Sequence, residues 1–295
     1  MTEQLIVFVL LLFGVFLLYI VSEKIKISYP ILLVIAGLII GAVPGMPTME
    51  MNPDIVFFIF LPPLLYAAAW STSWNDFWKW KRSIFLLAFG LVIFTSTVVA
   101  YFSVHLIPGF TLALGFLLGG IISPPDAVAA TSVMKGLTVP KRLSVILEGE
   151  SLINDASSLI IYRFAIAAVI TGAFSFSHAT GQFALVSIMG VVIGLAIANI
   201  LYVIHRFLPT TPSVDTAITL ISPYFCYLAA EYFHFSGVLS VVSAGLFLSW
   251  RADEIFNYQT RIQAINVWET LVFILNGVVF VLIGLQLPLI LDDLD

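Results

Sequence analysis

The chain has 295 residues, of which 61% are hydrophobic and 10% are charged, whereas an ordinary soluble domain is roughly 45 to 50% apolar and about 25% charged. This composition excludes a soluble globular protein and indicates a protein with many membrane-spanning segments. The 12 basic and 17 acidic residues leave no excess of positive charge for binding nucleic acid. The single cysteine, Cys226, excludes an internal disulfide bond.

Apolar runs of about 20 residues, bounded by proline, glycine or charged residues, recur along the chain and predict membrane-spanning helices. A membrane β-barrel would instead alternate apolar and polar residues in segments of about ten. We therefore expect an all-α polytopic membrane protein with about ten transmembrane helices, one of them discontinuous. In chain order, the predicted spans are 4–21, 30–43, 54–69, 84–106, the broken span 111–135, 143–171, 182–206, 214–232, 236–250 and 268–288.

The basic residues support this number of spans, because the cytoplasmic loops of membrane proteins collect lysine and arginine. All but one of them follow an odd-numbered span: Lys24, Lys26, Lys79, Lys81, Arg82, Lys135, Lys141, Arg142, Arg206, Arg251 and Arg261. Both termini of this chain are therefore expected on the outer, extracytoplasmic side of the membrane. The exception, Arg163, lies inside the sixth span.

Two segments near the inner ends of the spans are expected at the membrane surface. Residues 251–266 mix charge with apolar residues at helix-like spacing, which predicts an amphipathic helix on the inner surface, with a solvated loop as the alternative. Four tryptophans near the connection after the third span are expected to anchor it at the headgroup level. They are Trp70, Trp74, Trp78 and Trp80.

The fifth span contains a helix break in the sequence Ser123-Pro124-Pro125-Asp126. Each proline removes a backbone N–H and clashes with the preceding turn, so backbone carbonyls are left unpaired at mid-membrane depth. Such carbonyls are permissible only where they line a cavity or a site, or where neighbouring helices repair a simple kink. Because Asp126 lies at the break, the first alternative is favoured, and the segment predicts a cation site built from oxygen ligands.

The sixth span carries a polar stripe in an otherwise apolar helix. Ser151 and Asp155 lie one turn apart on one face, and Glu150 and Asn154 lie one turn apart on the neighbouring face. Glu148 lies two turns below Asp155. A carboxylate at the bilayer centre costs at least about 2.5 to 3.5 kcal/mol, and Asp155 lies about 20 Å deep. It is therefore expected to bind a proton or a cation, with a structural ion pair as the alternative.

Other charged residues inside or near the spans are less informative. Arg163 lies two turns beyond Asp155 and about 80° around the helix, so it does not simply neutralise Asp155. It either extends toward the outer face or pairs with a carboxylate of another helix. Glu269 lies near the start of the tenth span, whereas Asp215 and Glu231 lie near span ends and are expected to be interfacial.

Three classes of membrane protein compete for this pattern. A secondary transporter, in which a proton and a cation compete for the carboxylates of spans five and six, uses every feature above. An intramembrane aspartyl-type enzyme would need a second catalytic aspartate in a Gly-x-Gly-Asp setting, and the sequence has no such string and no His-Glu-x-x-His or Gly-x-Ser-x-Gly motif. A channel would need a filter or ring-forming motif, which is also lacking.

The strings Ile121-Ile-Ser-Pro-Pro-Asp-Ala-Val-Ala-Ala130, Ile146-Leu-Glu-Gly-Glu-Ser-Leu-Ile-Asn-Asp155 and Trp268-Glu-Thr-Leu-Val-Phe-Ile-Leu-Asn-Gly-Val-Val-Phe280 resemble sodium/proton antiporters of the NhaP/NHE type. The resemblance implies that Asp155 is the exchange site shared by cation and proton, and that Asn154 braces the two helices. It further implies a cation site completed by Asp126, Glu150, Ser151 and the Pro125 carbonyl, with Glu148, Arg163 and Glu269 in supporting roles. The Asn-Asp pair implies electroneutral, one-for-one exchange.

The same resemblance implies a multi-pass homodimer in the cell membrane, with monovalent cations, Na⁺ in the first instance, and protons as substrates, and with no cofactor and no structural metal. Two positions depart from many relatives, which have Thr and Pro where this chain has Pro125 and Ala127. The Thr hydroxyl is lost, although the Pro125 carbonyl is kept, so the sequence leaves the cation preference open.

The implied fold is an NhaA-like inverted-repeat antiporter fold, with two repeats of six spans joined by a linker helix. Residues 1–295 would form a single transport domain with scaffold helices in 1–70, core helices in 84–171, the linker helix in 182–206 and further scaffold helices in 214–288. Such a chain lacks the last three helices of the fold. It is therefore expected to be part of a longer protein, with a transport-incompetent fragment as the alternative to an active antiporter.

Overall fold

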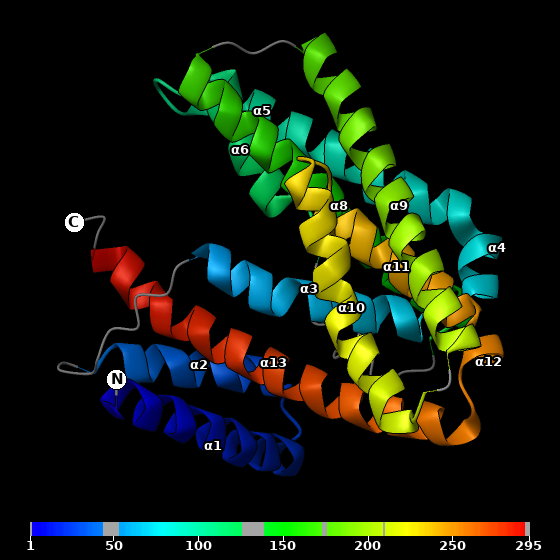
Figure 1. The fold of residues 1–295 in the computed structure, drawn as a ribbon. Helices are drawn as coiled ribbons and strands as arrows, with labels where there is room; N and C mark the ends of the chain where they lie inside the picture. Colours follow the sequence, from blue (N-terminus) through cyan, green and yellow to red (C-terminus); the bar gives the residue numbers. More distant parts are fainter. Residues whose placement is uncertain (1, 44–52, 126–138, 173–175, 209, 293–295) are drawn as a thin grey trace. The chain divides into compact units, whose positions relative to one another are not determined.

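The computed structural model describes residues 2–43, 53–125, 139–172, 176–208 and 210–292 (Figure 1). Over these residues every regular element is helical, which confirms the predicted all-α class. The chain forms two compact units, one of Met1–Leu64 with Ile265–Asp295 and one of Leu65–Ala264. We describe each unit by itself.

The first unit contains α1 (Thr2–Ile25), α2 (Tyr29–Gly41), most of α3 (Pro53–Ser71) and most of α13 (Tyr258–Asp292). Glycines let α2 and α13 approach closely. A Cβ atom at Gly37 would lie 2.3 Å from the Val281 carbonyl oxygen, and one at Gly284 would lie 2.3 Å from the Val34 carbonyl oxygen. Small residues of this kind bring helix backbones together in membranes, where no hydrophobic force drives helix association.

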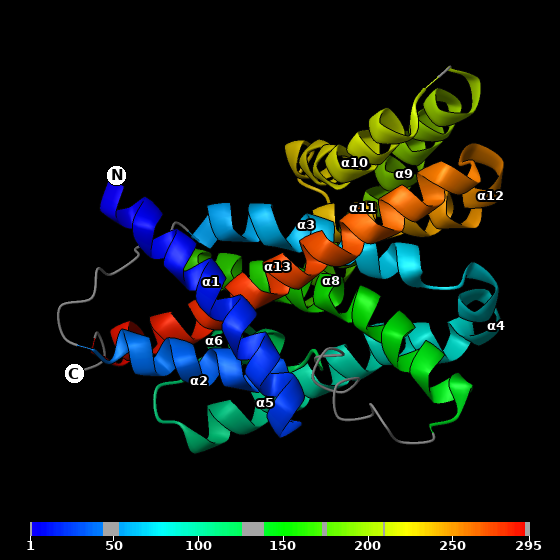
Figure 2. The same cartoon turned by 90° about the horizontal axis from the view of Figure 1, so that it is seen from below.

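The second unit contains the remaining helices (Figures 1 and 2). They are α4 (Trp74–Phe85), the π-helical segment η1 (Leu86–Leu91), α5 (Val92–Leu106), α6 (Leu112–Ile122), α8 (Lys141–Thr171), α9 (Phe176–Phe207), α10 (Pro212–Tyr232), α11 (Gly237–Trp250) and α12 (Ala252–Ile255). Helix α6 packs between α5 and α8, whereas α11 packs against α9 and α10.

Two pairs of glycines allow these close contacts. Cβ atoms at Gly115 and Gly119 would lie 2.7 and 2.6 Å from backbone atoms of α5. On α9, Cβ atoms at Gly190 and Gly194 would lie 2.6 and 2.1 Å from the backbone of Ser236 and Ser240. No side chain fits at these positions, so α6 lies directly on α5, and α9 lies directly on the corner between α10 and α11.

Four helices in the described part of the chain are long and apolar enough to cross a membrane, namely Trp74–Leu106, Lys141–Thr171, Thr180–Phe207 and Tyr258–Pro288. Shorter apolar helices cover 29–41, 55–71, 112–122 and 237–250. Each predicted span overlaps a helix in the part of the chain that the structure describes. Of the broken span 111–135, the described part is α6 with Ser123, Pro124 and Pro125.

One predicted helix boundary and one predicted surface helix are wrong. The span predicted at 84–106 begins at Trp74, because Ser73 caps α4 through a hydrogen bond from the Asp76 N–H, and the charged turn that follows is helical. The segment 251–266 is not one surface helix, because α12 ends at Ile255 and α13 begins at Tyr258. The Asn257 side chain accepts a hydrogen bond of 2.8 Å from the Thr260 N–H, and this cap starts a helix that continues into the last predicted span.

Candidate ion-binding site

Helix α8 is continuous over 31 residues and carries the predicted polar stripe in its first half. The Asn154 side chain is fully buried and its Nδ2 donates a hydrogen bond of 2.9 Å to Oε1 of Glu150, one turn earlier. Glu150 is 3% exposed. The two residues therefore form a pair inside the unit, as their spacing on one helix face predicts.

The same amide group joins α8 to the break after α6. Asn154 Nδ2 also donates a hydrogen bond of 3.1 Å to the carbonyl oxygen of Pro125. This carbonyl belongs to the Ser-Pro-Pro segment, where prolines cannot continue the helix and leave acceptors unpaired. One side chain thus contacts both halves of the predicted site, and we call the group Glu150, Asn154 and Pro125 the Asn154 network.

Two further oxygen atoms in this region are buried. The Oδ1 atom of Asn154 and the hydroxyl of Ser123 have no hydrogen-bond partner among the described residues. Buried polar atoms normally have partners, because a missing hydrogen bond costs about 1 to 3 kcal/mol. Oxygen atoms with unused lone pairs are the ligands that hard monovalent and divalent cations prefer. Ser123 was not among the predicted site residues, although it lies within the Ser-Pro-Pro-Asp string.

The other predicted site residues are found as follows. Asp155 and Ser151 are partly buried on the α8 face beside the Asn154 network, and the Ser158 hydroxyl donates to the Asp155 carbonyl oxygen at 3.0 Å.

The remaining predicted site residues lie apart from this network. Glu148 is exposed and accepts a hydrogen bond of 2.8 Å from the Ser144 hydroxyl. Asp126 lies outside the described residues. Glu269 is an exposed residue of α13 in the first unit.

A second contact holds the same part of α8 to η1. The hydroxyl of Ser157 donates a hydrogen bond of 2.5 Å to the carbonyl oxygen of Ala88, and both residues are fully buried. Ala88 lies in η1, where the wider π turn changes the pairing of backbone carbonyls. Helix α8 is therefore hydrogen-bonded to the break after α6 through Asn154 and to η1 through Ser157.

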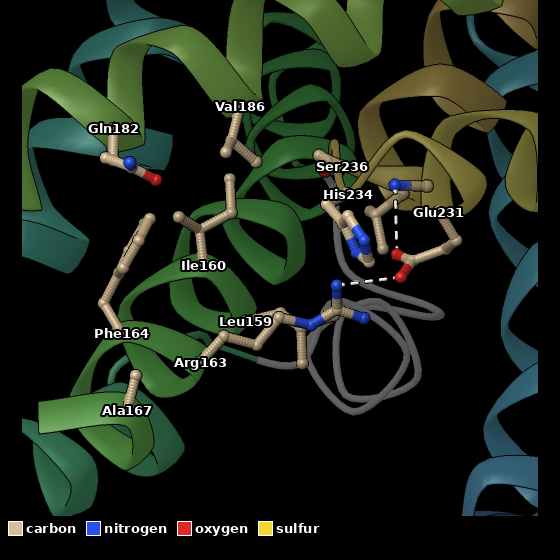
Figure 3. Close-up of a pocket in the computed structure, with 12 residues that line it drawn as sticks. Leu159, Ile160, Arg163, Phe164, Ala167, Gln182, Val186, Glu231, His234 and Ser236 are labelled. Carbon is tan, nitrogen blue, oxygen red and sulfur yellow. Dashed lines mark hydrogen bonds and ion pairs between the residues drawn. The ribbon is translucent and has the colours of Figure 1, made fainter. Parts of the chain in front are cut away.

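Arg163 pairs with a carboxylate of another helix, which is one of the two arrangements its sequence left open. Its Nη1 lies 2.9 Å from Oε2 of Glu231 at the end of α10 (Figure 3). The two side chains are 47% and 27% exposed, so the pair is only partly enclosed by the protein. Glu231 does not belong to the Asn154 network, and its place near a span end is the one feature of the sequence that points to it.

The chain is similar to known ion-transport proteins over most of its length. The family model described as "Sodium/hydrogen exchanger, transmembrane" matches residues 9–293. A sodium, potassium, lithium and rubidium/H⁺ antiporter of Bacillus pumilus is 35% identical over 269 residues, which are 89% of this chain and 40% of that protein. The Na⁺/H⁺ antiporter ApNhaP of Aphanothece halophytica is 35% identical over 266 residues, which are 89% of this chain and 50% of that protein.

The fold resembles a solved structure. The sodium proton antiporter MjNhaP1 of Methanocaldococcus jannaschii superposes with a TM-score of 0.71 and 21% identity, over 94% of this chain and 68% of that chain. This chain thus spans 40 to 50% of the length of the two sequence relatives. These relatives are described as transporters, which favours a transporter over the intramembrane enzyme alternative.

Proposed function

Because the chain belongs to the sodium/hydrogen exchanger family, we propose that it forms part of the membrane domain of an antiporter that exchanges a monovalent cation, in the first instance Na⁺, for H⁺. The observation that carries the proposal is a pair of hydrogen bonds. The Asn154 amide donates to the Glu150 carboxylate and to the Pro125 carbonyl, and Asn154 lies on the same turn of α8 as Asp155. A helix break rich in oxygen atoms, held against a polar turn of a neighbouring helix, is how secondary transporters bind small cations at mid-membrane depth.

Asp155 is the proposed exchange residue, to which the cation and the proton bind in turn. The cation takes further oxygen ligands from Asp126, Glu150, Ser151 and the Pro125 carbonyl. Asn154 positions two of these groups rather than binding the cation with its amide nitrogen. Its Oδ1 atom and the Ser123 hydroxyl, both buried without partners among the described residues, are additional oxygen atoms in the same region.

The proposed coupling of cation and proton movement follows from the free-energy cost of an unneutralised carboxylate inside the membrane. A carboxylate without a partner costs at least about 2.5 to 3.5 kcal/mol at the bilayer centre, so the site crosses the membrane readily only when a cation or a proton neutralises it. One cation then moves for each proton. Such exchange carries no net charge and is unaffected by a membrane potential, which otherwise contributes about 2.3 kcal/mol per charge per 100 mV.

The proposed transport cycle is alternating access, in which core helices in 84–171 move against scaffold helices in 1–70 and 214–288, with the helix 182–206 as the linker. We further propose a homodimer in the cell membrane with both ends of this chain outside. The distribution of lysine and arginine supports that orientation.

Exchange in sealed vesicles tests the proposal. A pH gradient should drive Na⁺ uptake by the reconstituted protein, and Asp155→Asn should abolish it, whereas Asp253→Asn, at a carboxylate whose side chain is 86% exposed, should retain it. Retained exchange in Asp155→Asn would refute the assignment of the exchange residue. An imposed potential should leave the rate unchanged, and acceleration would contradict electroneutral exchange. Exchange by the 295-residue chain alone would exclude the transport-incompetent alternative.

A further inference from the structure

The ion pair between Arg163 and Glu231 joins helices that belong to different parts of the proposed transport cycle. Arg163 lies on α8, among the proposed core helices, and Glu231 ends α10, among the proposed scaffold helices. Their side-chain atoms Nη1 and Oε2 lie 2.9 Å apart. If α8 moves with the core relative to α10 in the scaffold, these two atoms must separate during the transport cycle.

The α10–α11 corner fixes the carboxylate of this pair. Oε1 of Glu231 accepts a hydrogen bond of 3.4 Å from the N–H of Gly237 at the start of α11, while its backbone carbonyl accepts one of 2.9 Å from the His234 N–H. A Cβ atom at Gly237 would lie 2.6 Å from the Tyr227 ring and 3.1 Å from Oε1 of Glu231. Glycine at 237 therefore leaves room for the carboxylate, and the long arginine side chain is the partner that can swing away.

A cavity of about 270 Å³ lies beside the pair (Figure 3). Leu159, Arg163 and Ala167 of α8 line one wall, and Gln182 of α9 and Ser236 of the α10–α11 corner line the opposite side. Leu159 lies one turn beyond Asp155 on α8. The space thus extends along α8 from the turn next to Asp155 to Arg163, and it is large enough for several water molecules.

We propose that the Arg163–Glu231 pair is a latch that holds the outer ends of α8 and α10 together and favours the state in which this cavity is closed to the outside. The inference rests on the proposed antiport and assigns a role to the one basic residue outside the cytoplasmic loops. A half-exposed ion pair supplies little free energy. The latch therefore shifts the balance between inward-open and outward-open states by about two- to fivefold rather than blocking either state.

Thiol labelling from outside the membrane tests the latch. Cys226, the only native cysteine and a buried one, is replaced by alanine, and Leu159→Cys is introduced into the cavity wall. In vesicles oriented as in cells, a membrane-impermeant thiol reagent should label this cysteine about two- to fivefold faster when Arg163→Gln or Glu231→Gln is added. Both changes should act in the same direction, and combining them should add nothing, because either one opens the same pair.

Matched variants distinguish an effect of the Arg163–Glu231 pair on labelling from a general destabilisation of the protein. Arg163→Lys keeps the charge and should label at the parent rate, and exchanging the two residues, Arg163→Glu with Glu231→Arg, should restore that rate. Arg261→Gln removes the ion pair between Arg261 and Asp253, which does not involve α8, and should leave labelling unchanged. Unchanged labelling in both single variants, or changes of opposite sign, would refute the latch.

The labelling needs no ion gradient, so its result does not depend on transport. A parent protein that fails to exchange ions would refute the proposed function even if labelling followed the pattern above. Conversely, normal exchange with unchanged labelling in both single variants would leave the antiporter intact and eliminate the latch.

Discussion

The two polar regions of α8 are built in opposite ways. The Asn154 network is buried, with Asn154 fully enclosed, Glu150 3% exposed and both contacts made by one amide. The Arg163–Glu231 pair, two turns further along the same helix, joins two formal charges whose side chains are 47% and 27% exposed. The protein encloses the first region, whereas it leaves both partners of the second partly uncovered.

This difference in burial decides what each region can do. A buried donor or acceptor that loses its partner costs about 1 to 3 kcal/mol, so the Asn154 network holds its atoms in one arrangement. An exposed ion pair is worth about 0 to 1 kcal/mol, so it can open and close at ordinary temperature. The helix therefore combines a rigid ligand-positioning segment with a contact suited to movement.

The largest predicted effect is the stabilisation of the protein by its cation. If the cation binds at the Asn154 region, Na⁺ at 100 times its dissociation constant should stabilise the protein by about 2.7 kcal/mol. Asp155→Asn should remove this effect, and Arg163→Gln should leave it unchanged. Thermal unfolding of purified protein in Na⁺ against choline measures it. The comparison of the two regions would break down if Asp155→Asn kept the full response or Arg163→Gln lost it.

Replacing the central amide should have the next largest effect. Asn154→Leu leaves the buried Glu150 without its amide donor and should lower the free energy of unfolding by about 1 to 3 kcal/mol. Adding Glu150→Leu should recover part of the loss, because the stranded polar group is then removed. Thermal unfolding measures both, with Ile153→Leu as a buried apolar control. No loss in Asn154→Leu would show that the network contributes nothing to stability.

A smaller effect is expected for the contact with η1. Ser157→Ala should cost about 0.6 kcal/mol, the average for a hydrogen bond between helices in a membrane protein. Ser158→Ala is the matched control, since the Ser158 hydroxyl bonds only the Asp155 carbonyl within its own helix. Equal losses in the two variants would mean that the Ser157–Ala88 bond between α8 and η1 adds nothing.

The smallest effect on stability is expected at the latch. Arg163→Gln should lower the free energy of unfolding by less than about 0.5 kcal/mol, and the difference should shrink at high ionic strength because salt screens exposed charges. Unfolding in low and high choline chloride tests this without adding a transported cation. A loss as large as that of Asn154→Leu would end the distinction between the two regions.

Local patterns predicted much of this arrangement. The double proline located the break, and the spacing of Glu150 and Asn154 placed them on one face, where they now form a hydrogen bond. Contacts between distant residues could not be predicted. Glu231 is 68 positions from Arg163, and nothing in either local sequence selects the other.

The hydrogen bond between Ser157 and Ala88 also could not be predicted from sequence patterns. Its acceptor is a backbone carbonyl in η1, and the apolar residues of that segment do not distinguish a π turn from an α turn. Similarly, the charged residues of α4 interrupt the apolar run, so hydropathy placed the start of the helix at residue 84 rather than at Trp74. In both places a hydrogen bond between one side chain and the backbone shapes the structure, and hydropathy does not detect it.

The glycine contacts between α5 and α6 have a consequence for selectivity. Because Gly115 and Gly119 leave no gap against the α5 backbone, any displacement of α5 is transmitted to the end of α6 and to the Pro125 carbonyl. A larger side chain at Gly119 would shift that oxygen relative to Asn154 without touching either residue. At the proposed cation site, the preference among Na⁺, K⁺ and Li⁺ would depend on the distances between the ligand oxygens. We therefore expect changes at the α5–α6 surface, well away from those oxygens, to alter this preference.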